Sequence, residues 1–353
     1  MNGRAVVRCF RRTFGGTDVG MNMIKVAVTA TEFDKAAEVF RQAARVGVEC
    51  LRAPAAEAEL AVFVRAQGVR HVIVGVEKYT GVLYEALPAG AVLARFGVGH
   101  DGIDKDKATA RGVICTNTPG VLDDSVAEMT IALILAAARH VAKVAAEVKK
   151  GGFAPMVGSE LAGKTLAVIG CGPIGRRVAR IAARGFGMRV VGCDVADLDI
   201  ERMKTEYGFA ETGKDYGAAV ATADFVSLHI PSTPATRHFM NRERLAMIPA
   251  GAWLINTARG AVLDEAALFD ALSEGRPAGA ALDVFEAEPY APVAPEKDLR
   301  KLDNVVMTPH VGSSTREACN RMAERALQNV RLAEAGRFGE MDLLNPAVIG
   351  GRS

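Results

Sequence analysis

The hydrophobic residues of this chain alternate between short β-branched runs and longer stretches with helical spacing, from Ile24 onward. Helical spacing occurs near residues 33–45, 56–67 and 104–111. This alternation is typical of a parallel α/β sheet. It predicts a first α/β unit of about a hundred residues. Its expected strands are Ile24–Thr29, Val48–Leu51, His71–Val74, Ala91–Arg95 and Val113–Thr116.

A long helix is predicted next, over Asp124–Lys149. Ser125 and Glu128 have the spacing of a capping box at its start, and Gly151–Gly152 is placed to end it. Its middle, Ile131–Ala138, is apolar on nearly all sides. Such a helix is expected to be buried between domains or between subunits.

A second α/β series follows that helix. The pattern then predicts a last helix from about Thr315 to Ala335, whose apolar or small positions are Ala318, Met322, Ala326, Val330 and Ala333. Two doubly wound parallel sheets account for the whole pattern. The strands predicted in the second series are Thr165–Ile169, Arg189–Cys193, Asp224–His229, Ala252–Asn256, Gly279–Leu282 and Asn304–Met307.

Length, charge and cysteine content narrow the class of protein. A chain of 353 residues is long enough for two domains. Its 43 basic and 41 acidic residues give a net charge of +2, which argues against nucleic acid or an acidic membrane as the partner. The longest wholly apolar stretch is too short to span a bilayer. Six scattered cysteines without a CxxC pair favour a reducing, cytoplasmic location, and no metal-binding cluster is evident.

The first residues differ from the rest of the chain. Residues 1–22 are rich in arginine but lack the apolar core of a secretory signal. We predict that they form a disordered extension that the fold does not need.

A glycine-rich turn lies between the first two strands of the second series. The first glycine permits a tight turn, the second lets a pyrophosphate approach the backbone, and the third lets the following helix pack on the strand. The diphosphate would then meet the amino end of that helix. The turn is formed by Gly170, Cys171, Gly172, Pro173, Ile174 and Gly175.

Asp194 ends the next strand, 19 residues after Gly175. At this distance a carboxylate can accept hydrogen bonds from the hydroxyls of an adenosine ribose. It would repel a 2′-phosphate, and the following Val195 and Ala196 offer no guanidinium to receive one. The turn and Asp194 together predict a dinucleotide site that favours NAD over NADP.

Three later segments each bring polar groups to the carboxyl end of a predicted strand. Arg259 follows one strand, Asp283, Glu286 and Glu288 follow the next, and His310 follows the last. Ligands of open α/β sheets bind outside these strand ends. The groups suit hydride transfer at a secondary alcohol, because a cation can hold a carboxylate and polarise a carbonyl while an imidazole exchanges the proton.

These features together resemble the D-isomer-specific 2-hydroxyacid dehydrogenases, the family of phosphoglycerate dehydrogenase, glyoxylate/hydroxypyruvate reductase and D-lactate dehydrogenase. The resemblance covers about residues 24–346. It rests on the segments RFGVGHDGID, TNTPGVLDDSVAE, LAGKTLAVIGCGPIGRRVA, HIPSTPATRHFMN, LINTARGAVLDEAAL, GAALDVFEAEP and NVVMTPHVGSST.

The resemblance implies roles for particular residues. Arg259, Glu288 and His310 would be the catalytic residues, and the backbone of Val98 and Gly99 would hold the substrate carboxylate together with Arg259. Towards the cofactor, Pro231 and Thr257 would line its cleft and Asp283 would contact the nicotinamide carboxamide.

It also implies an NAD-binding domain over residues 120–310, inserted into a discontinuous flavodoxin-like substrate domain of residues 23–119 and 311–353. A homodimer would form through the helix near residues 124–149.

The chain departs from the family's pattern near the substrate. Members specific for phosphoglycerate often carry an arginine in the loop after the third strand, where this chain has Gly75 and Val76. Lys78 supplies a charge nearby, but as a flexible point charge. The candidates for the hydroxy acid therefore remain 3-phosphoglycerate, D-lactate and the products of hydroxypyruvate and glyoxylate reduction.

Two other functions fit the same fold, because fold alone does not fix function. One is an NAD(H)-sensing scaffold that works by binding partners. The other is a dehydrogenase of phosphite or formate.

Overall fold

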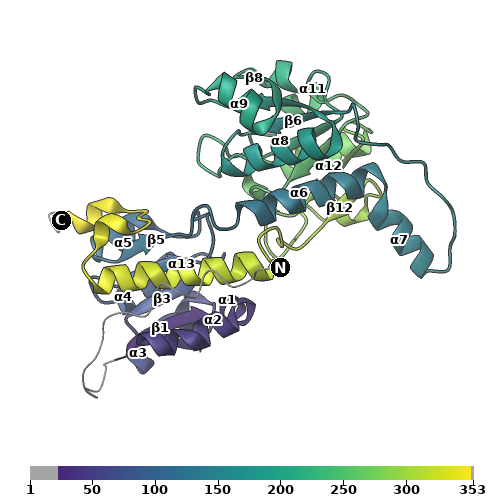
Figure 1. Cartoon of the computed structure of the whole chain (residues 1–353). Coiled ribbons are helices and arrows are strands. Elements are labelled where there is room, and N and C mark those ends of the chain that lie inside the picture. Colours follow the sequence, from purple (N-terminus) through teal and green to yellow (C-terminus); the bar gives the residue numbers. More distant parts are fainter. Residues whose placement is uncertain (1–22, 351–353) are drawn as a thin grey trace, which may run out of the picture.

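The computed structural model describes residues 23–350, and the extension predicted over residues 1–22 lies outside them. The strands of the described residues form two parallel sheets, of five and seven strands. Figure 1 shows these sheets in two bodies, with α6 and α13 running near the junction between them. The expectation of two doubly wound α/β units is confirmed.

The first sheet has the strand order β2-β1-β3-β4-β5. Its strands are buried on both faces at most positions, as expected for a parallel sheet covered by helices. Their bounds are β1 Ile24–Thr29, β2 Val48–Ala53, β3 His71–Val74, β4 Val92–Arg95 and β5 Ile114–Thr116. The accompanying helices are α1 Ala30–Lys35, α2 Ala37–Gln42, α3 Glu57–Gln67, α4 Val82–Ala86 and α5 Lys105–Ala110.

The helix predicted over residues 33–45 is interrupted. Ala36 leaves the helical conformation, with φ −137° and ψ 37°, and separates α1 from α2. A 3₁₀ turn, Ala43–Val46, then leads to Gly47. The helical spacing of hydrophobic residues did not reveal these breaks, because Phe33 and Phe40 still face the same core.

The second sheet has the order β12-β11-β10-β9-β6-β7-β8. The order reverses beside β6, and this is the point where open α/β sheets bind ligands. The strands are β6 Thr165–Ile169, β7 Arg189–Cys193, β8 Phe209–Gly213, β9 Phe225–Leu228, β10 Trp253–Asn256, β11 Gly279–Leu282 and β12 Val305–Met307. The helices are α8 Pro173–Phe186, α9 Ile200–Tyr207, α10 Tyr216–Val220, α11 Arg242–Met247 and α12 Glu265–Ser273. The edge strand β8 was not predicted.

The helix predicted over residues 124–149 is in fact two helices. α6 (Asp123–Ala138) and α7 (Val141–Lys149) meet at an angle of 66°. His140 adopts a left-handed conformation, with φ 52°, and makes the break. α6 is largely buried, as expected, whereas α7 has no buried residue. In Figure 1, α7 and the segment after it project from the body of the molecule.

The predicted capping box at the start of α6 is wrong. Leu122 occupies the capping position and makes no side-chain cap. The Ser125 hydroxyl instead donates a hydrogen bond of 2.8 Å to the carbonyl of Gly312. This long-range contact ties the start of α6 to the loop that follows β12.

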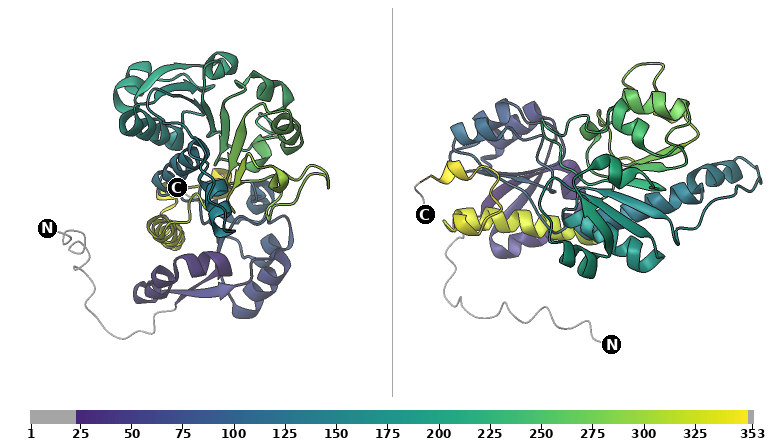
Figure 2. Two further views of the ribbon diagram at one scale, coloured as in Figure 1. Left: turned by 90° about the vertical axis from the view of Figure 1, so that its right-hand side faces the viewer. Right: turned by 90° about the horizontal axis from the view of Figure 1, so that it is seen from above.

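The last helix, α13 (Arg316–Glu334), returns to the first sheet. The Thr315 hydroxyl accepts a hydrogen bond from the Ala318 amide and caps its start. Its buried side chains share a core with β1 and β4, and Figures 1 and 2 show it beside the first sheet. Along the chain, the strands of the first sheet come first, those of the second sheet follow, and α13 then returns to the first sheet.

In the described part of the chain, no single helix is long and apolar enough to cross a membrane. The bent pair α6 and α7 passes the same test of length and composition.

Candidate active site

The glycine-rich turn joins β6 to α8, as predicted. A Cβ on Gly175 would lie 2.1 Å from the carbonyl oxygen of Gly170, so packing of the helix on the turn requires glycine there. Gly170 has φ 96° and a close approach to His229. A Cβ on Gly172 would meet no atom of residues 23–350 within 4 Å. Protein packing thus leaves open space over Gly172, where the backbone of the helix start can receive a phosphate group.

Asp194 lies against the same turn from the end of β7. Its Oδ2 accepts a hydrogen bond of 2.7 Å from the Cys171 amide, and its Oδ1 accepts one of 2.9 Å from the Ala196 amide. Each carboxylate oxygen has a second lone pair, which leaves capacity for ribose hydroxyls. The turn and the carboxylate therefore fit the adenosine half of a dinucleotide.

The strands that follow place the other residues expected near the cofactor at the same edge of the sheet. Pro231 follows β9 and is exposed, and Thr257 follows β10 and is buried. The Thr257 hydroxyl lies 2.8 Å from that of Thr130 on α6. This hydrogen bond fixes the end of β10 to α6.

Asp283, after β11, is 1% exposed and already has several partners. Its Oδ1 accepts hydrogen bonds from the Thr308 hydroxyl (2.6 Å) and the Val311 amide (2.9 Å). Its Oδ2 accepts one from the Gly312 amide, at 2.7 Å. The carboxylate thus orders the loop that carries His310, and its contact with the nicotinamide stays a prediction.

His310 and Glu288 are paired. His310 Nδ1 lies 2.7 Å from Glu288 Oε2, and each side chain is 26% exposed. Since an ionised carboxylate only accepts, Nδ1 carries the shared hydrogen. Burial raises the pKa of Glu288, but the hydrogen bond and charge of His310 lower it below its usual value overall. The ring's Nε2 makes no hydrogen bond to the described residues, so it can reach a ligand.

Two backbone contacts hold this pair in place. Glu288 Oε1 accepts a hydrogen bond of 3.0 Å from the Phe285 amide. The His310 amide donates one of 2.8 Å to the carbonyl of Asp283. His310 has φ 53°, a conformation rare for a side chain of this size.

Arg259 joins the second sheet to the first. Its Nε donates to Asp101 across 3.1 Å, and its Nη1 donates to the carbonyl of Ala258 at 2.6 Å. A Cβ on Gly99 would lie 1.1 Å from its Nη2, so only glycine lets the guanidinium rest against that backbone. The structure therefore places the Arg259 guanidinium against the backbone of Gly99, the residue after Val98, and their binding of a carboxylate stays a prediction.

Arg259 also acts on the His310–Glu288 pair, since its charge contributes to the lowered pKa of Glu288. Asp101, the partner of Arg259, was not assigned a role from the sequence. The sequence feature that could have identified Asp101 is its position two residues after Gly99, in the segment RFGVGHDGID.

Glu265 is a further residue that the sequence did not single out. It begins α12 and is 2% exposed. Its Oε1 accepts a hydrogen bond of 2.6 Å from the Glu286 amide, and the Glu265 amide donates to Glu286 Oε1 at 3.2 Å. Its Oε2 is buried and has no hydrogen-bond partner among the described residues. Burial, with the nearby charges of Glu286 and Glu288, raises the pKa of Glu265 to about 7.

Glu286 also lies near a second imidazole. Glu286 Oε2 is 2.9 Å from His238 Nε2. Glu286, a candidate from the sequence, therefore belongs to this supporting network rather than to the His310 pair.

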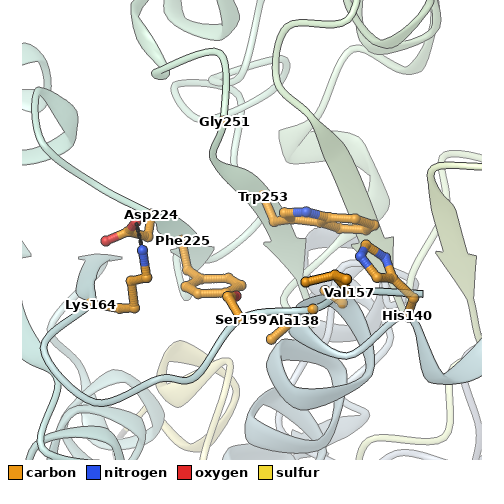
Figure 3. A pocket seen from close by; sticks show the side chains of 11 residues that line it. Ala138, His140, Val157, Ser159, Lys164, Asp224, Phe225, Gly251 and Trp253 are labelled. Atoms are coloured by element: carbon orange, nitrogen blue, oxygen red, sulfur yellow. Dashed lines mark ion pairs between the residues drawn. The ribbon is translucent and has the colours of Figure 1, made fainter. Parts of the chain in front are cut away.

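A pocket away from these residues lies at the opposite edge of the second sheet (Figure 3). Trp253 and Phe225, at the starts of β10 and β9, form part of its lining, together with Val157. The His140 and Trp253 rings are 6.4 Å apart there. Because ligands of open α/β sheets bind at the carboxyl ends of strands, this pocket is not the expected cofactor site.

The chain matches the family model described as "D-isomer specific 2-hydroxyacid dehydrogenase, NAD binding domain" over residues 131–312. It is 40% identical over 277 residues to the glyoxylate reductase of Korarchaeum cryptofilum, covering 76% of this chain and 80% of that protein. It is 40% identical over 259 residues to the hydroxypyruvate reductase of Thermotoga maritima, covering 72% and 80%.

Among solved structures it resembles the D-lactate dehydrogenase of Aquifex aeolicus complexed with NAD and lactic acid. The TM-score is 0.77 with 30% identity, covering 91% of this chain and 99% of that one. The match of more than half the chain to the family model agrees with the open glycine turn and the grouped polar residues. The chain therefore belongs to the D-isomer specific 2-hydroxyacid dehydrogenases and is an NAD-dependent oxidoreductase.

Proposed function

We propose that the protein interconverts a small 2-oxo acid and its D-2-hydroxy acid, with Arg259, Glu288 and His310 as catalytic residues. The observation that carries this assignment is the 2.7 Å His310–Glu288 pair, together with an arginine held against Gly99. A proton donor and a carboxylate-binding cation are the two groups that the reaction requires of the protein.

The guanidinium of Arg259 and the backbone of Val98 and Gly99 bind the carboxylate of the substrate. The incoming carboxylate competes with Asp101, which forms a 3.1 Å ion pair with Arg259. One carboxylate replaces the other, so the charge of Arg259 stays paired throughout. Binding of the carboxylate orients the carbonyl group of the substrate, and the charge of Arg259 polarises that carbonyl.

His310 transfers the proton. In reduction, its Nε2 donates to the oxygen of the substrate as the alkoxide forms, and in oxidation it accepts the same proton. Glu288 stabilises the cationic ring and fixes its orientation through Nδ1. When bound, NADH would supply the hydride, and Arg259 with the backbone of Val98 and Gly99 would hold the substrate in position to receive it.

For the cofactor, we propose binding over Gly170, Gly172, Pro173, Ile174 and Gly175, with Asp194 on the adenosine ribose and Pro231, Thr257 and Asp283 nearer the nicotinamide. The carboxylate of Asp194 at this place favours NAD over NADP.

The proposed domains follow the two sheets. Residues 120–310 form the NAD-binding domain, and residues 23–119 with 311–353 form the substrate domain. The return of α13 to the first sheet supports this division.

We further propose a homodimer in which a second copy of this chain covers α7 and the segment after it. Val148 is 55% exposed, Phe153 92% and Val157 96%. Large apolar side chains gathered on a projecting arm favour a protein partner over water. The continuity of this arm with the largely buried α6 supports a partner that packs along both. The five free cysteines of the described residues support a reducing, cytoplasmic location.

The test of the reaction is NADH oxidation with glyoxylate, hydroxypyruvate and pyruvate, followed by chiral analysis of the product. We expect turnover of at least one of them and a product of D configuration. NADH binding without turnover of any 2-oxo acid would contradict the proposal and favour the NAD(H)-sensing alternative. Turnover of phosphite or formate alone would favour the alternative of a phosphite or formate dehydrogenase.

A further inference from the structure

The turn that carries Val98 and Gly99 has two backbone N–H groups that remain available to a ligand. Neither amide donates a hydrogen bond within residues 23–350. Gly99 also lies against the guanidinium of Arg259, because a Cβ there would be 1.1 Å from its Nη2. Successive N–H groups that point the same way form an anion-binding concavity in proteins. The direction of these two N–H groups therefore decides whether the turn can bind a carboxylate beside Arg259.

The carbonyl groups behind both amides are bonded to one segment, the residues that follow β5. The Thr118 amide donates a hydrogen bond of 3.1 Å to the carbonyl of Gly97. Asn117 donates one of 2.8 Å from Nδ2 to the carbonyl of Val98. In a trans peptide the C=O and N–H groups point in opposite directions. The N–H groups of Val98 and Gly99 are therefore both turned away from this segment.

Of these two hydrogen bonds, only that of Asn117 depends on a side chain. The Thr118 bond uses a backbone amide, which any residue but proline supplies. The side chain of Asn117 must present its nitrogen, because an amide oxygen facing the Val98 carbonyl would place two acceptors together. Its donation also polarises the peptide and strengthens the N–H at the other end as a donor. Asn117 thus both orients the Gly99 N–H and makes it a better partner for an anion.

Asn117 is itself held firmly, at 9% exposed, by α13 and the segment after it. Asn329, on α13, donates from Nδ2 to the Asn117 carbonyl at 3.3 Å and to Asp342 Oδ2 at 3.0 Å. The Asn117 amide donates to the carbonyl of Asp342 at 3.4 Å. Arg325 binds both carboxylate oxygens of Asp342, at 2.6 and 2.7 Å. The side chain of Asn117 is therefore attached to a backbone that is fixed on both sides.

We propose that Asn117 is a positioning residue, which orients the Gly99 N–H towards the substrate carboxylate by holding the Val98 carbonyl. The proposal rests on the proposed function, in which Arg259 receives the same carboxylate. Asn117 acts through the Val98–Gly99 peptide and not by contact with the substrate. Its loss is expected to weaken carboxylate binding and to leave NADH binding and proton transfer in place.

The test separates carboxylate binding from chemistry and from stability. The wild type, Asn117→Ala and Asn117→Asp are assayed for KM and kcat with glyoxylate and hydroxypyruvate. Inhibition by oxamate, which carries the carboxylate but is not reduced, measures binding alone. Asn304→Ala is the matched control, because Asn304 Nδ2 also donates to a backbone carbonyl, that of Ala278 at 3.0 Å. Asn304 precedes β12 and so lies at the opposite edge of the second sheet from the site.

In Asn117→Ala we expect KM for both 2-oxo acids and the inhibition constant of oxamate to rise about tenfold, the typical effect of one hydrogen bond in an anion site. Both kcat and NADH affinity should change by less than about threefold. Asn304→Ala should leave KM and oxamate inhibition at their wild-type values, even where it lowers Tm.

Asn117→Asp keeps the shape of the side chain and changes its ability to donate. An ionised carboxylate would face the Val98 carbonyl as a second acceptor, so KM should rise at least as much as in Asn117→Ala. A protonated carboxyl can donate again. The ratio of the variant KM to the wild-type KM should therefore fall from about pH 8 to about pH 5. A merely structural role would give no such recovery, and this variant carries the test where Asn117→Ala does not fold.

Three results would overturn the proposal. One is an unchanged KM and unchanged oxamate inhibition in a folded Asn117 variant. Another is an equal rise of KM in Asn304→Ala, which would show a general effect of lost stability. The third is a KM ratio for Asn117→Asp that does not change with pH. Failure of the wild type to reduce any 2-oxo acid with NADH bound would instead overturn the proposed function.

Discussion

Glu265 and Glu286 hold each other through reciprocal hydrogen bonds, in which the amide of each donates to the carboxylate of the other at 3.2 and 2.6 Å. Glu286 lies two residues before Glu288, so this pair fixes the loop that presents Glu288 to His310. The proposed catalytic carboxylate thus depends on a buried glutamate at the start of α12.

The raised pKa of Glu265 predicts that the stability of the folded protein depends on pH. Because its pKa is raised from 4.5 to about 7 in the folded protein, the unfolded chain releases this proton at lower pH than the native state does. The Glu265 contribution to the free energy of unfolding is therefore expected to fall by up to about 1.4 kcal/mol per pH unit as pH rises from 4.5 to 7. Glu265→Gln should remove that slope in urea unfolding followed by circular dichroism. A slope identical in the variant and the wild type would contradict the raised pKa.

A side chain at position 172 is expected to weaken cofactor binding without lowering the stability of the fold. A Cβ there would meet no atom of the described part of the chain within 4 Å, so Gly172→Ala should change Tm little. The same methyl group would occupy the space through which a diphosphate approaches the backbone, and NADH affinity should fall at least tenfold, by about 1.4 kcal/mol. Fluorescence titration with NADH measures this loss. As the contrasting variant, Gly175→Ala should lower Tm as well, because its Cβ would lie 2.1 Å from a carbonyl oxygen.

The position of the Asp194 carboxylate predicts that the protein prefers NAD to NADP. Removing its carboxylate in Asp194→Ala deletes the acceptor for the ribose hydroxyls and the charge that repels a 2′-phosphate. Affinity for NAD should fall while affinity for NADP rises or stays level, as measured by titration calorimetry. Asp197→Ala, nearby and 96% exposed at its side chain, is the control. An equal loss for both dinucleotides in Asp194→Ala would refute the ribose assignment.

The exposed apolar side chains of α7 and of the segment after it predict a homodimer. Val148 and Phe153 lie on α7 and on the segment after it, both largely exposed in a single copy. Replacing both by glutamate should convert a dimer into a monomer with little loss of Tm, since neither packs in the core of its own chain. Light scattering coupled to size-exclusion chromatography gives the mass. A wild-type mass near 37.3 kDa would contradict the homodimer.

The parts predicted well from the sequence are those determined by local patterns. Apart from β8, the strands from Ile24 to Met307, the glycine turn and the start of α13 follow from spacing within a few residues. β8 was missed because Phe209–Gly213 is an edge strand with only one buried residue, so it carries little hydrophobic signal.

Contacts between distant segments account for the errors and omissions. Ser125 has the spacing of a cap but bonds to Gly312, 187 residues away. Asp101 pairs with Arg259 across 158 residues, and local spacing cannot predict a pairing over that separation. The break at His140 depends on a left-handed residue that is not glycine, which propensity alone does not reveal.

Proton transfer by His310, paired with Glu288, is tested by kcat for hydroxypyruvate reduction by His310→Asn, measured beside NADH affinity. Asparagine tolerates the left-handed backbone, and His140→Asn, at φ 52°, is the matched control. We expect a kcat at least about 100-fold lower in His310→Asn, with NADH affinity unchanged and a normal kcat in the control. Reduction of hydroxypyruvate at the wild-type rate by His310→Asn would show that His310 does not transfer the proton.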